Sequence, residues 1–275
     1  MAKILKSVYV YNMPPYSLNS YQPRFPGIEV HYLENVPLGG AGDFDWHQNK
    51  VVGPYWRAYW NENAGGIVQV GHQEIQLKPD RVVVLSPDTV YSTRLVQPIR
   101  HFYVHFSSGR PFSQVAPGIF ELTDVNLVSQ ARQLAELVQT QQDDYRTHMK
   151  LQQYLCEVLL QLPTEVIPPL TDYDSRIERV IALLEKVECP ANPQLARMVN
   201  MSTNGFLHLF KQHVGVSPQR YARRRRLEQA AIQLQYSGKS IEEISDEMGF
   251  ADRFHFTKCF KNEFGIGPAA YRKFH

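Results

Sequence analysis

An internal repeat near the carboxyl end constrains the fold of this chain more than any other feature. Residues 195–221 and 244–271 align when one segment is shifted by fifty positions. The matched positions share phenylalanine, glycine, proline and tyrosine, which are residues that form cores or end helices. They are Phe206 with Phe256, Phe210 with Phe260, Lys211 with Lys261, Gly215 with Gly265, Pro218 with Pro268 and Tyr221 with Tyr271. Such a repeat indicates two copies of one structural unit.

Each copy of the repeat predicts a helix-turn-helix unit. In the first copy, Ser202 is expected to cap a helix that carries Phe206 and Phe210 on one face and ends at Gly215. The second copy has the same order of signals and ends at Gly265. Both copies therefore predict a short helix, a tight turn and a second helix.

The face of each second helix that lies away from the phenylalanines carries mostly hydrogen-bonding and cationic side chains. Such side chains reach base edges and phosphates from a DNA major groove. A solvated face on an ordinary helical bundle is the alternative, and the duplication favours DNA. The predicted DNA contacts are Thr203, Asn204, Leu207, His208 and Lys211 in the first copy, and Arg253, Phe254, His255 and Lys258 in the second.

The segment from residue 174 to 275 resembles the DNA-binding domain of the AraC/XylS family of bacterial transcription regulators. The resemblance implies seven helices, with a long helix that holds the two units at a fixed angle. It rests on Leu195-Ala196, Phe210-Lys211, Gly215, Ser217-Pro218, Tyr221, Arg225, Ile244-Ser245, Gly249-Phe250, residues 254–256, Phe260-Lys261, Phe264-Gly265, Pro268 and Tyr271-Arg272.

The segment between the two copies predicts one long helix, which begins at Ser217 and Pro218. Residues 223–226 are four consecutive arginines. Adjacent cations repel one another, so some of them should meet phosphate or an acidic partner. We expect Arg223 and Arg224 to contact the DNA backbone. Ion pairs with Glu228 and plain solvation are the alternatives.

The length of 275 residues allows two domains, each with its own core. From residue 174 onward there are 16 Lys and Arg against 11 Asp and Glu, so the repeat-bearing part is basic, whereas the part before it has 13 against 16. Three scattered cysteines show no metal-ligand spacing and favour a reducing compartment. No apolar run has the length of a signal peptide or a membrane span. We therefore expect a cytoplasmic protein without membrane contact.

Residues 28–106 consist of short β-branched or alternating runs separated by turn residues, a pattern typical of an antiparallel β-protein. We expect a jelly-roll β-barrel at about residues 25–120, which makes the whole chain α+β. The predicted strands are residues 51–52, 57–60, 66–70, 74–77, 81–85 and 102–106.

The same region resembles, more weakly, the cupin-type sensor domain of sugar-responsive members of the AraC/XylS family. Metal-dependent cupins gather two or three histidines and a glutamate. Here Tyr91 occupies a histidine position, and the early stretch offers only His47 beside Gln48. We therefore expect no metal, no cofactor and no catalytic residue.

An aromatic cluster in the predicted barrel indicates a ligand pocket. Rings beside imidazole and charged groups suit a sugar, which has apolar C–H patches and a rim of hydroxyls. The alternative is that the rings fill the barrel and His105 is a core histidine. The resemblance places His101 and Tyr103 at ligand-contacting positions and Arg24 in an arm over the pocket. The predicted ligand contacts are Arg24, Trp46, His47, Trp56, Arg57, Tyr59, Trp60, Tyr91, His101 and Tyr103.

Residues 125–162 predict two amphipathic helices, whose surplus apolar face suits a homodimer; an intramolecular hairpin is the alternative. Prolines in residues 164–173 predict a linker. The expected domains are residues 1–163, for sensing and dimerisation, and residues 174–275, for DNA.

These features predict a sequence-specific DNA-binding transcription regulator that responds to a small molecule. The effector is expected to be a sugar or sugar-like metabolite and the controlled genes those of carbohydrate catabolism, with double-stranded DNA and RNA polymerase as partners. Two alternatives stay open: a cupin-type metal-dependent enzyme with His47, His101 and His105 as ligands, and a regulator whose barrel only dimerises.

Overall fold

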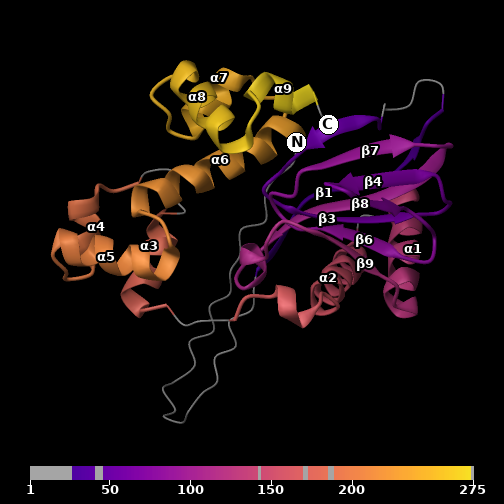
Figure 1. Ribbon diagram of the computed structural model, residues 1–275, viewed down its shortest axis with the longest axis horizontal. Helices are drawn as coiled ribbons and strands as arrows, with labels where there is room; N and C mark the ends of the chain where they lie inside the picture. The colour runs from indigo at the N-terminus through magenta and orange to yellow at the C-terminus, as the bar shows by residue number, and fades with distance from the viewer. Residues whose placement is uncertain (1–26, 41–45, 142–143, 170–172, 185–188, 274–275) are drawn as a thin grey trace, which may run out of the picture.

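The computed structural model describes residues 27–40, 46–141, 144–169, 173–184 and 189–273. Figure 1 shows the strands gathered in one part of the molecule and the carboxyl-terminal helices in another, with the long helix α6 running toward the strands. Within these ranges, no helix has the length and apolar character needed to span a membrane.

The strands form two antiparallel sheets, as the alternating runs predict, and the sheets face each other without closing into a barrel. Strands β1, β7 and β9 are additions to the strands predicted from the sequence. The five-stranded sheet has the order β1 (Ile28–Leu38), β8 (Ile99–Ser108), β3 (Trp56–Asn61), β6 (Val82–Leu85) and β9 (Ile119–Leu122). The four-stranded sheet has the order β2 (Gln48–Val51), β7 (Tyr91–Leu95), β4 (Gly66–Val70) and β5 (Gln73–Gln76).

Strand β3 is buried along its whole length because both of its faces are covered. Successive side chains of a strand point to opposite faces of the sheet. Trp56 and Trp60 pack in the cluster that includes the two helices after the strands, whereas Tyr59 packs in the cluster between the sheets. The five-stranded sheet therefore separates a helix-covered core from the interior of the sandwich.

Helices α1 (Val125–Gln139) and α2 (Tyr145–Leu160) occupy the predicted region and cover the five-stranded sheet (Figure 1). Asp124 and Asp144 cap them, each accepting a hydrogen bond from a backbone N–H of the first turn. Apolar residues of both helices, including Leu134 and Tyr154, join the core on that face of the sheet.

The carboxyl-terminal domain is all-helical, with a separate core for each helix-turn-helix unit. Ala222 of α6 packs in the first core and Leu234 of α6 packs in the second. The predicted linking helix therefore joins both units rigidly. The helices are α3 (Ser175–Leu184), α4 (Asn192–Met198), α5 (Thr203–Val214), α6 (Pro218–Tyr236), α7 (Ile241–Glu247), α8 (Arg253–Phe264) and α9 (Pro268–Lys273).

The two units use equivalent turn chemistry. Asn200 and Gly249 take up the left-handed conformation in the turns before α5 and α8, with φ of 55° and 67°. Ser202 and Asp252 then cap the second helix of each unit through their side chains. The turn residues are 49 positions apart and the caps 50 apart, so the second turn is one residue longer. The second helices of the two units therefore repeat at a spacing of 50 residues, whereas the first helices repeat at a spacing of 49.

Candidate functional site

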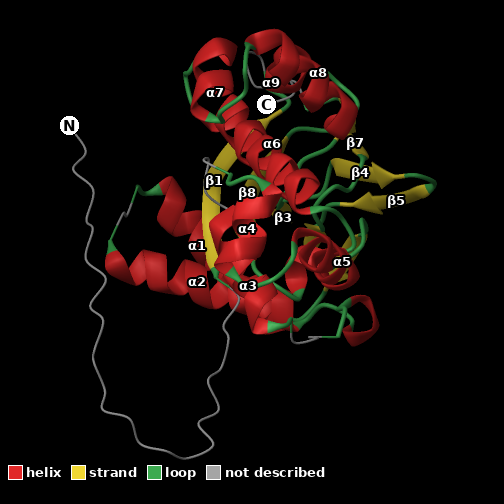
Figure 2. Cartoon of the chain, turned by 90° about the vertical axis from the view of Figure 1, so that its left-hand side faces the viewer, coloured by secondary structure: helices red, strands yellow, loops and turns green. Residues whose placement is uncertain are grey.

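Helices α5 and α8 lie near the two ends of α6 and on the same side of it in Figure 2. Phe206 and Phe210 bury one face of α5, and Phe256 and Phe260 bury the corresponding face of α8. Because α6 contributes to both cores, the two outward faces keep a fixed relation to each other.

The outward faces carry the side chains predicted to contact DNA. In α5, Asn204, His208 and Lys211 are exposed, while Thr203 and Leu207 are half-buried. In α8 the exposed set is Arg253, Phe254, His255 and Lys258, and the ring of Phe254 is 85% exposed. A large apolar ring left in solvent among cations is typical of a surface that binds a partner.

The four consecutive arginines of α6 lie in different surroundings, and the predicted alternative of an ion pair with Glu228 occurs for Arg224 and Arg225. Arg223 is exposed, whereas Arg225 pairs with Glu228 at 2.7 Å. Arg226 donates hydrogen bonds to the carbonyl oxygens of Met248 and Gly249, at 3.3 and 3.2 Å, and so braces the turn before α8.

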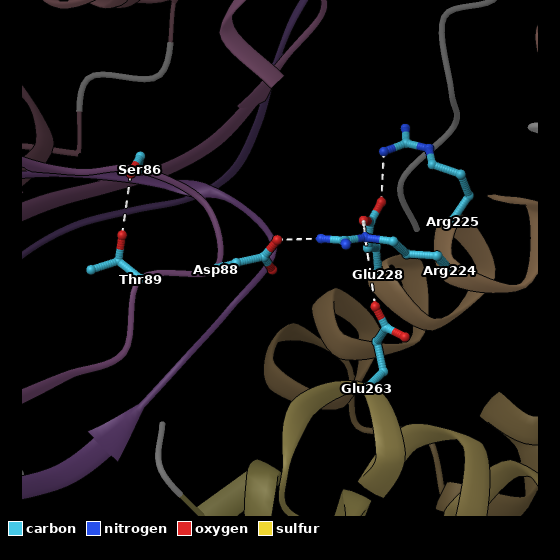
Figure 3. A network of polar contacts seen from close by, with 7 residues as sticks. All are labelled: Ser86, Asp88, Thr89, Arg224, Arg225, Glu228 and Glu263. Carbon is cyan, nitrogen blue, oxygen red and sulfur yellow. Dashed lines mark hydrogen bonds and ion pairs between the residues drawn. The ribbon is translucent and has the colours of Figure 1, made fainter. Parts of the chain in front are cut away.

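Arg224 forms several ion pairs, one of them with Glu228, the partner named in the alternative prediction, and its contact with the DNA backbone stays a prediction. Its guanidinium forms an ion pair with Asp88, in the loop between β6 and β7, and it also lies 2.9 Å from Glu228 and 3.6 Å from Glu263 of α8 (Figure 3). The network joins the β-sandwich, α6 and the second helix-turn-helix unit.

Asp88 is held in place by its own loop. Its backbone is left-handed, with φ of 60°, and its N–H donates to the carbonyl oxygen of Gly53 at 2.9 Å. The side-chain hydroxyls of Ser86 and Thr89 form a hydrogen bond of 3.2 Å, which fixes the turn around Asp88 (Figure 3). Burial raises the pKa of the Asp88 carboxyl, and this effect together with nearby Glu228 outweighs the lowering by Arg224.

A cavity of about 500 Å³ opens between the two sheets and the end of α6. Pairing of β1 with β8 places Tyr32 opposite His105, Glu34 opposite Tyr103 and Val36 opposite His101 on the cavity face. The wall consists of Tyr32, Glu34, Val36, Pro37, Leu38, Trp46, Gln48, Tyr59, Tyr91, His101, Tyr103, His105, Gln235 and Tyr236.

Hydrogen bonds within the wall set its chemistry. The Tyr103 hydroxyl donates to Glu34 Oε2 at 2.8 Å, and the hydroxyls of Tyr59 and Tyr91 lie 3.0 Å apart. His101 Nδ1 lies 3.0 Å from Asn61 Oδ1. Burial lowers the pKa of His101 to about 3, so this imidazole is neutral at physiological pH.

The carboxyl-terminal helical domain closes one side of this cavity. The ring of Tyr236 stacks on that of Tyr32 with centroids 4.8 Å apart, and its hydroxyl is hydrogen-bonded to His105 Nδ1. Beside it, the Tyr55 hydroxyl donates to Gln235 Oε1. A molecule in the cavity would thus touch both domains.

Comparison with known proteins agrees with this architecture. A family model described as a helix-turn-helix domain matches residues 195–273. An uncharacterized HTH-type transcriptional regulator of Haemophilus influenzae is 38% identical over 96 residues, which are 34% of this chain and 32% of that protein. The HTH-type transcriptional activator RhaS of Escherichia fergusonii is 36% identical over 102 residues, 36% of this chain and 37% of that protein. The chain thus matches about a third of the length of these two relatives.

Longer matches have lower identity. The raffinose operon transcriptional regulatory protein RafR of Pediococcus pentosaceus is 22% identical over 247 residues, 84% of this chain and 89% of that protein. A structure of apo ToxT from Vibrio cholerae, at 13% identity, has a TM-score of 0.52 and covers 92% of this chain and 98% of that one. The helical domain of this chain is of the AraC/XylS type. The relation of the chain to ToxT concerns the fold alone.

Five of the predicted ligand contacts gather around the cavity: Trp46, Tyr59, Tyr91, His101 and Tyr103. The prediction is wrong for Trp56 and Trp60, because their positions in β3 alternate with Tyr59 and place them in the helix-covered core. The stretch was interpreted as one cluster although a strand cannot point consecutive rings to the same side.

Two further predicted contacts, His47 and Arg57, are not part of the wall. His47 is exposed and borders a separate depression on the outer face of the four-stranded sheet, so it does not join His101 and His105 as the cupin-enzyme alternative requires. Arg57 is fully buried, with its guanidinium 4.4 Å from the ring centre of Tyr55. Arg24 lies outside the described residues.

The sequence interpretation missed several wall residues. Tyr32 and Glu34 lie on β1, whose alternation was not recognised as a strand, although Tyr32, Glu34 and Val36 follow a period of two. Gln235 and Tyr236 come from the other domain of the chain, and no local signal in the sequence indicates that contact.

Proposed function

We propose that this chain is a sequence-specific DNA-binding transcription regulator whose DNA binding responds to a small molecule held in the cavity. One observation carries the proposal: two outward-facing, hydrogen-bonding helices, α5 and α8, are fixed to a single helix that shares a core with each of them.

Each outward face would enter a major groove. Asn204 and His208 from α5 and Arg253 and Lys258 from α8 have side chains that can pair with base edges or phosphates. Helix-turn-helix units that read the same face of a duplex lie about one turn, or ~10 base pairs, apart. Because the two faces differ in sequence, each monomer would read an asymmetric site.

The small molecule would act through α6. Its last residue, Tyr236, is part of the cavity wall, while the same helix supports both DNA-facing units. A ligand that prefers one arrangement of the two domains shifts the population toward it. Binding in the cavity would therefore change how the DNA-facing helices are presented.

We infer a sugar or a sugar-like metabolite as the effector, and genes of carbohydrate use as the target. Aromatic rings and hydrogen-bonding groups alternate around the cavity, which suits a hydroxylated ring. RafR, which aligns with this chain over most of its length, is named as the regulatory protein of a raffinose operon, and this supports the same class of effector.

A homodimer through α2 completes the proposal. Met149 and Leu160 are 66% and 72% exposed, and Tyr145 and Cys156 are exposed near them on the helix. Their spacing of four, seven and four residues puts them on one stripe. Pairing of two such stripes would bury apolar surface that α2 leaves in solvent.

Selection from random-sequence DNA by the purified full-length chain tests the DNA-binding proposal. Recovery of one asymmetric motif, bound at least ~100-fold more tightly than its scrambled version in electrophoretic shifts, is the expected result. The triple variant Asn204→Ala, His208→Ala, Arg253→Ala should lose that preference and keep its helical circular dichroism. Equal binding to all sequences by the unaltered chain would contradict sequence-specific recognition.

A further inference from the structure

The cavity wall has an unusual charge balance. Among the described residues that line it, Glu34 is the only acid, and none is Lys or Arg. His101 is neutral, as its lowered pKa shows, and the other imidazole, His105, shares a hydrogen bond with Tyr236. The described part of the wall therefore presents one carboxylate and no Lys or Arg to an occupant.

The nearest buried cation is kept out of the wall. Arg57 is fully buried, and its guanidinium lies 4.4 and 5.1 Å from the ring centres of Tyr55 and Tyr91. Tyr91 lines the cavity and Arg57 does not. An anionic ligand would lose its hydration without meeting a cation among the described wall residues, and burial of an unpaired charge is unfavourable.

The aromatic rings favour the opposite kind of ligand. Tyr32, Trp46, Tyr59, Tyr103 and Tyr236 surround the space, and the faces of such rings carry partial negative charge. They attract C–H groups and repel anions. The aromatic rings and the Glu34 carboxylate therefore both favour an uncharged ligand over an anionic one.

Glu34 has acceptor capacity to spare for a ligand. It is half-buried on β1, and its Oε2 accepts the hydrogen bond from Tyr103. Tyr32 also interacts with this carboxylate, and because a carboxylate has about four lone-pair sites, the contacts with Tyr103 and Tyr32 leave room for ligand hydroxyls. Tyr103 holds the carboxylate in a fixed position on the cavity face of the sheet.

We propose that Glu34 is the polar anchor of the cavity, where it accepts hydrogen bonds from hydroxyls of an uncharged saccharide and excludes sugar acids. This inference rests on the proposed ligand-sensing function and adds its specificity. Glu34 acts as a specificity-determining residue through direct contact with the ligand. The selection comes from the lone carboxylate together with the lack of a counter-cation among the wall residues.

Calorimetric titration of the full-length chain tests the proposal. The probes are raffinose and two matched pairs, galactose with galacturonate and glucose with glucuronate, each compared at constant pH and ionic strength. We expect at least one neutral sugar to bind, and to bind at least ~10-fold more tightly than its acid, a difference of ~1.4 kcal/mol. Equal or tighter binding of the acid, or no response to any neutral sugar, would overturn the proposal.

Two variants assign the selectivity to Glu34. Glu34→Gln keeps the shape of the side chain and removes its charge, and should weaken the neutral sugar ~10-fold and narrow the preference over the acid. The control Glu74→Gln makes the same change on β5, where Glu74 pairs with Arg94 outside the cavity, and should bind like the unaltered chain. Melting of both variants confirms folding; unchanged affinity in folded Glu34→Gln would refute the anchor.

Electrophoretic shifts with the selected DNA motif separate this proposal from the regulatory one. If sugars fail while sequence-specific DNA binding persists, only the ligand class is lost. If DNA binding fails and sugar selectivity persists, the cavity inference stands and the regulator proposal falls.

Discussion

Arg224, in the middle of the carboxyl-terminal domain, is ion-paired with Asp88, in a loop of the β-sandwich (Figure 3). The pair joins segments that are 136 residues apart in sequence, and Arg224 extends the connection to Glu263 of α8. One side chain of the linking helix thus contacts both the β-sandwich and the helix proposed to read DNA.

The change Asp88→Asn should loosen the contact between the domains without disturbing the loop, because Asn also tolerates a left-handed backbone. The side chains of Arg224 and Asp88 are 47% and 34% exposed, and burial raises the pKa of Asp88. We therefore expect the free energy of unfolding to fall by at most ~0.5 to 1 kcal/mol. The measurement is the rate of limited proteolysis within residues 163–173, which should rise. Asp80→Asn, which removes a pair inside the β-sandwich, is the control; equal rates in both variants would argue against a joint role for Asp88.

DNA contacts of two kinds should separate by mutation. Arg253→Ala should cost ~1 to 3 kcal/mol on the preferred site and relax the preference at one base, as expected for a base-reading arginine. Arg223→Ala should instead weaken binding to all DNA sequences alike and should reduce the slope of log affinity against log salt concentration by ~1. Electrophoretic shifts over a salt series measure both. A uniform loss for Arg253→Ala would assign that side chain to the phosphates.

The two helix-turn-helix cores should fail separately. Phe210→Ala and Phe260→Ala each remove a fully buried ring, which costs ~3 to 5 kcal/mol. Phe254→Ala removes a ring that is largely exposed and should leave stability within ~0.5 kcal/mol. Urea unfolding followed by circular dichroism compares the three, and a normal midpoint for Phe210→Ala would show that the core assignment is wrong.

These phenylalanines also show why the helical domain was predictable from sequence. The sequence features that predict it are local: helix caps, glycines that end helices and apolar residues at helical spacing. Each feature occurs in both copies of the repeat, so each copy supports the interpretation of the other. The cavity is different because its wall comes from strands that lie far apart in the chain. Trp56 and Tyr59 are three residues apart and face opposite sides of the sheet, and only the strand register reveals this.

The domain contact was beyond sequence reasoning for a related reason. Tyr236 and Arg224 are ordinary helix residues in their local context, and nothing near them indicates stacking on Tyr32 or pairing with Asp88. Arginines in a run are interpreted most simply as phosphate contacts. Only the packing of α6 on the sandwich brings Asp88 to one of them.

The proposed dimer should depend on the stripe of α2. Met149→Glu combined with Leu160→Glu places two charges in the proposed interface and should convert dimer to monomer in sedimentation equilibrium. Both side chains are already exposed, so the fold of the monomer should be unaffected. Val96→Glu changes an equally exposed apolar residue elsewhere and is the control. A dimer that survives the double change would move the interface away from α2.

The stability of the sensor domain should depend on pH through His101. Burial lowers the pKa of this side chain to about 3 in the folded chain, against 6.5 for a free imidazole. The unfolded chain therefore binds the proton more readily, and protonation favours unfolding. The contribution of neutral His101 is present in full above pH 6.5 and is lost as pH falls below it, by up to ~1.4 kcal/mol per pH unit.

Tryptophan fluorescence reports this effect selectively, because Trp46, Trp56 and Trp60 all lie in the sandwich and are the only tryptophans of the chain. Urea unfolding between pH 7.5 and ~4.5 should show the free energy of unfolding falling with pH, and His101→Gln should remove part of that slope. His72→Gln changes an exposed histidine of the turn between β4 and β5 and should keep the slope. If His101→Gln and the unaltered chain lose stability in parallel as the pH falls, His101 is not held neutral by the fold.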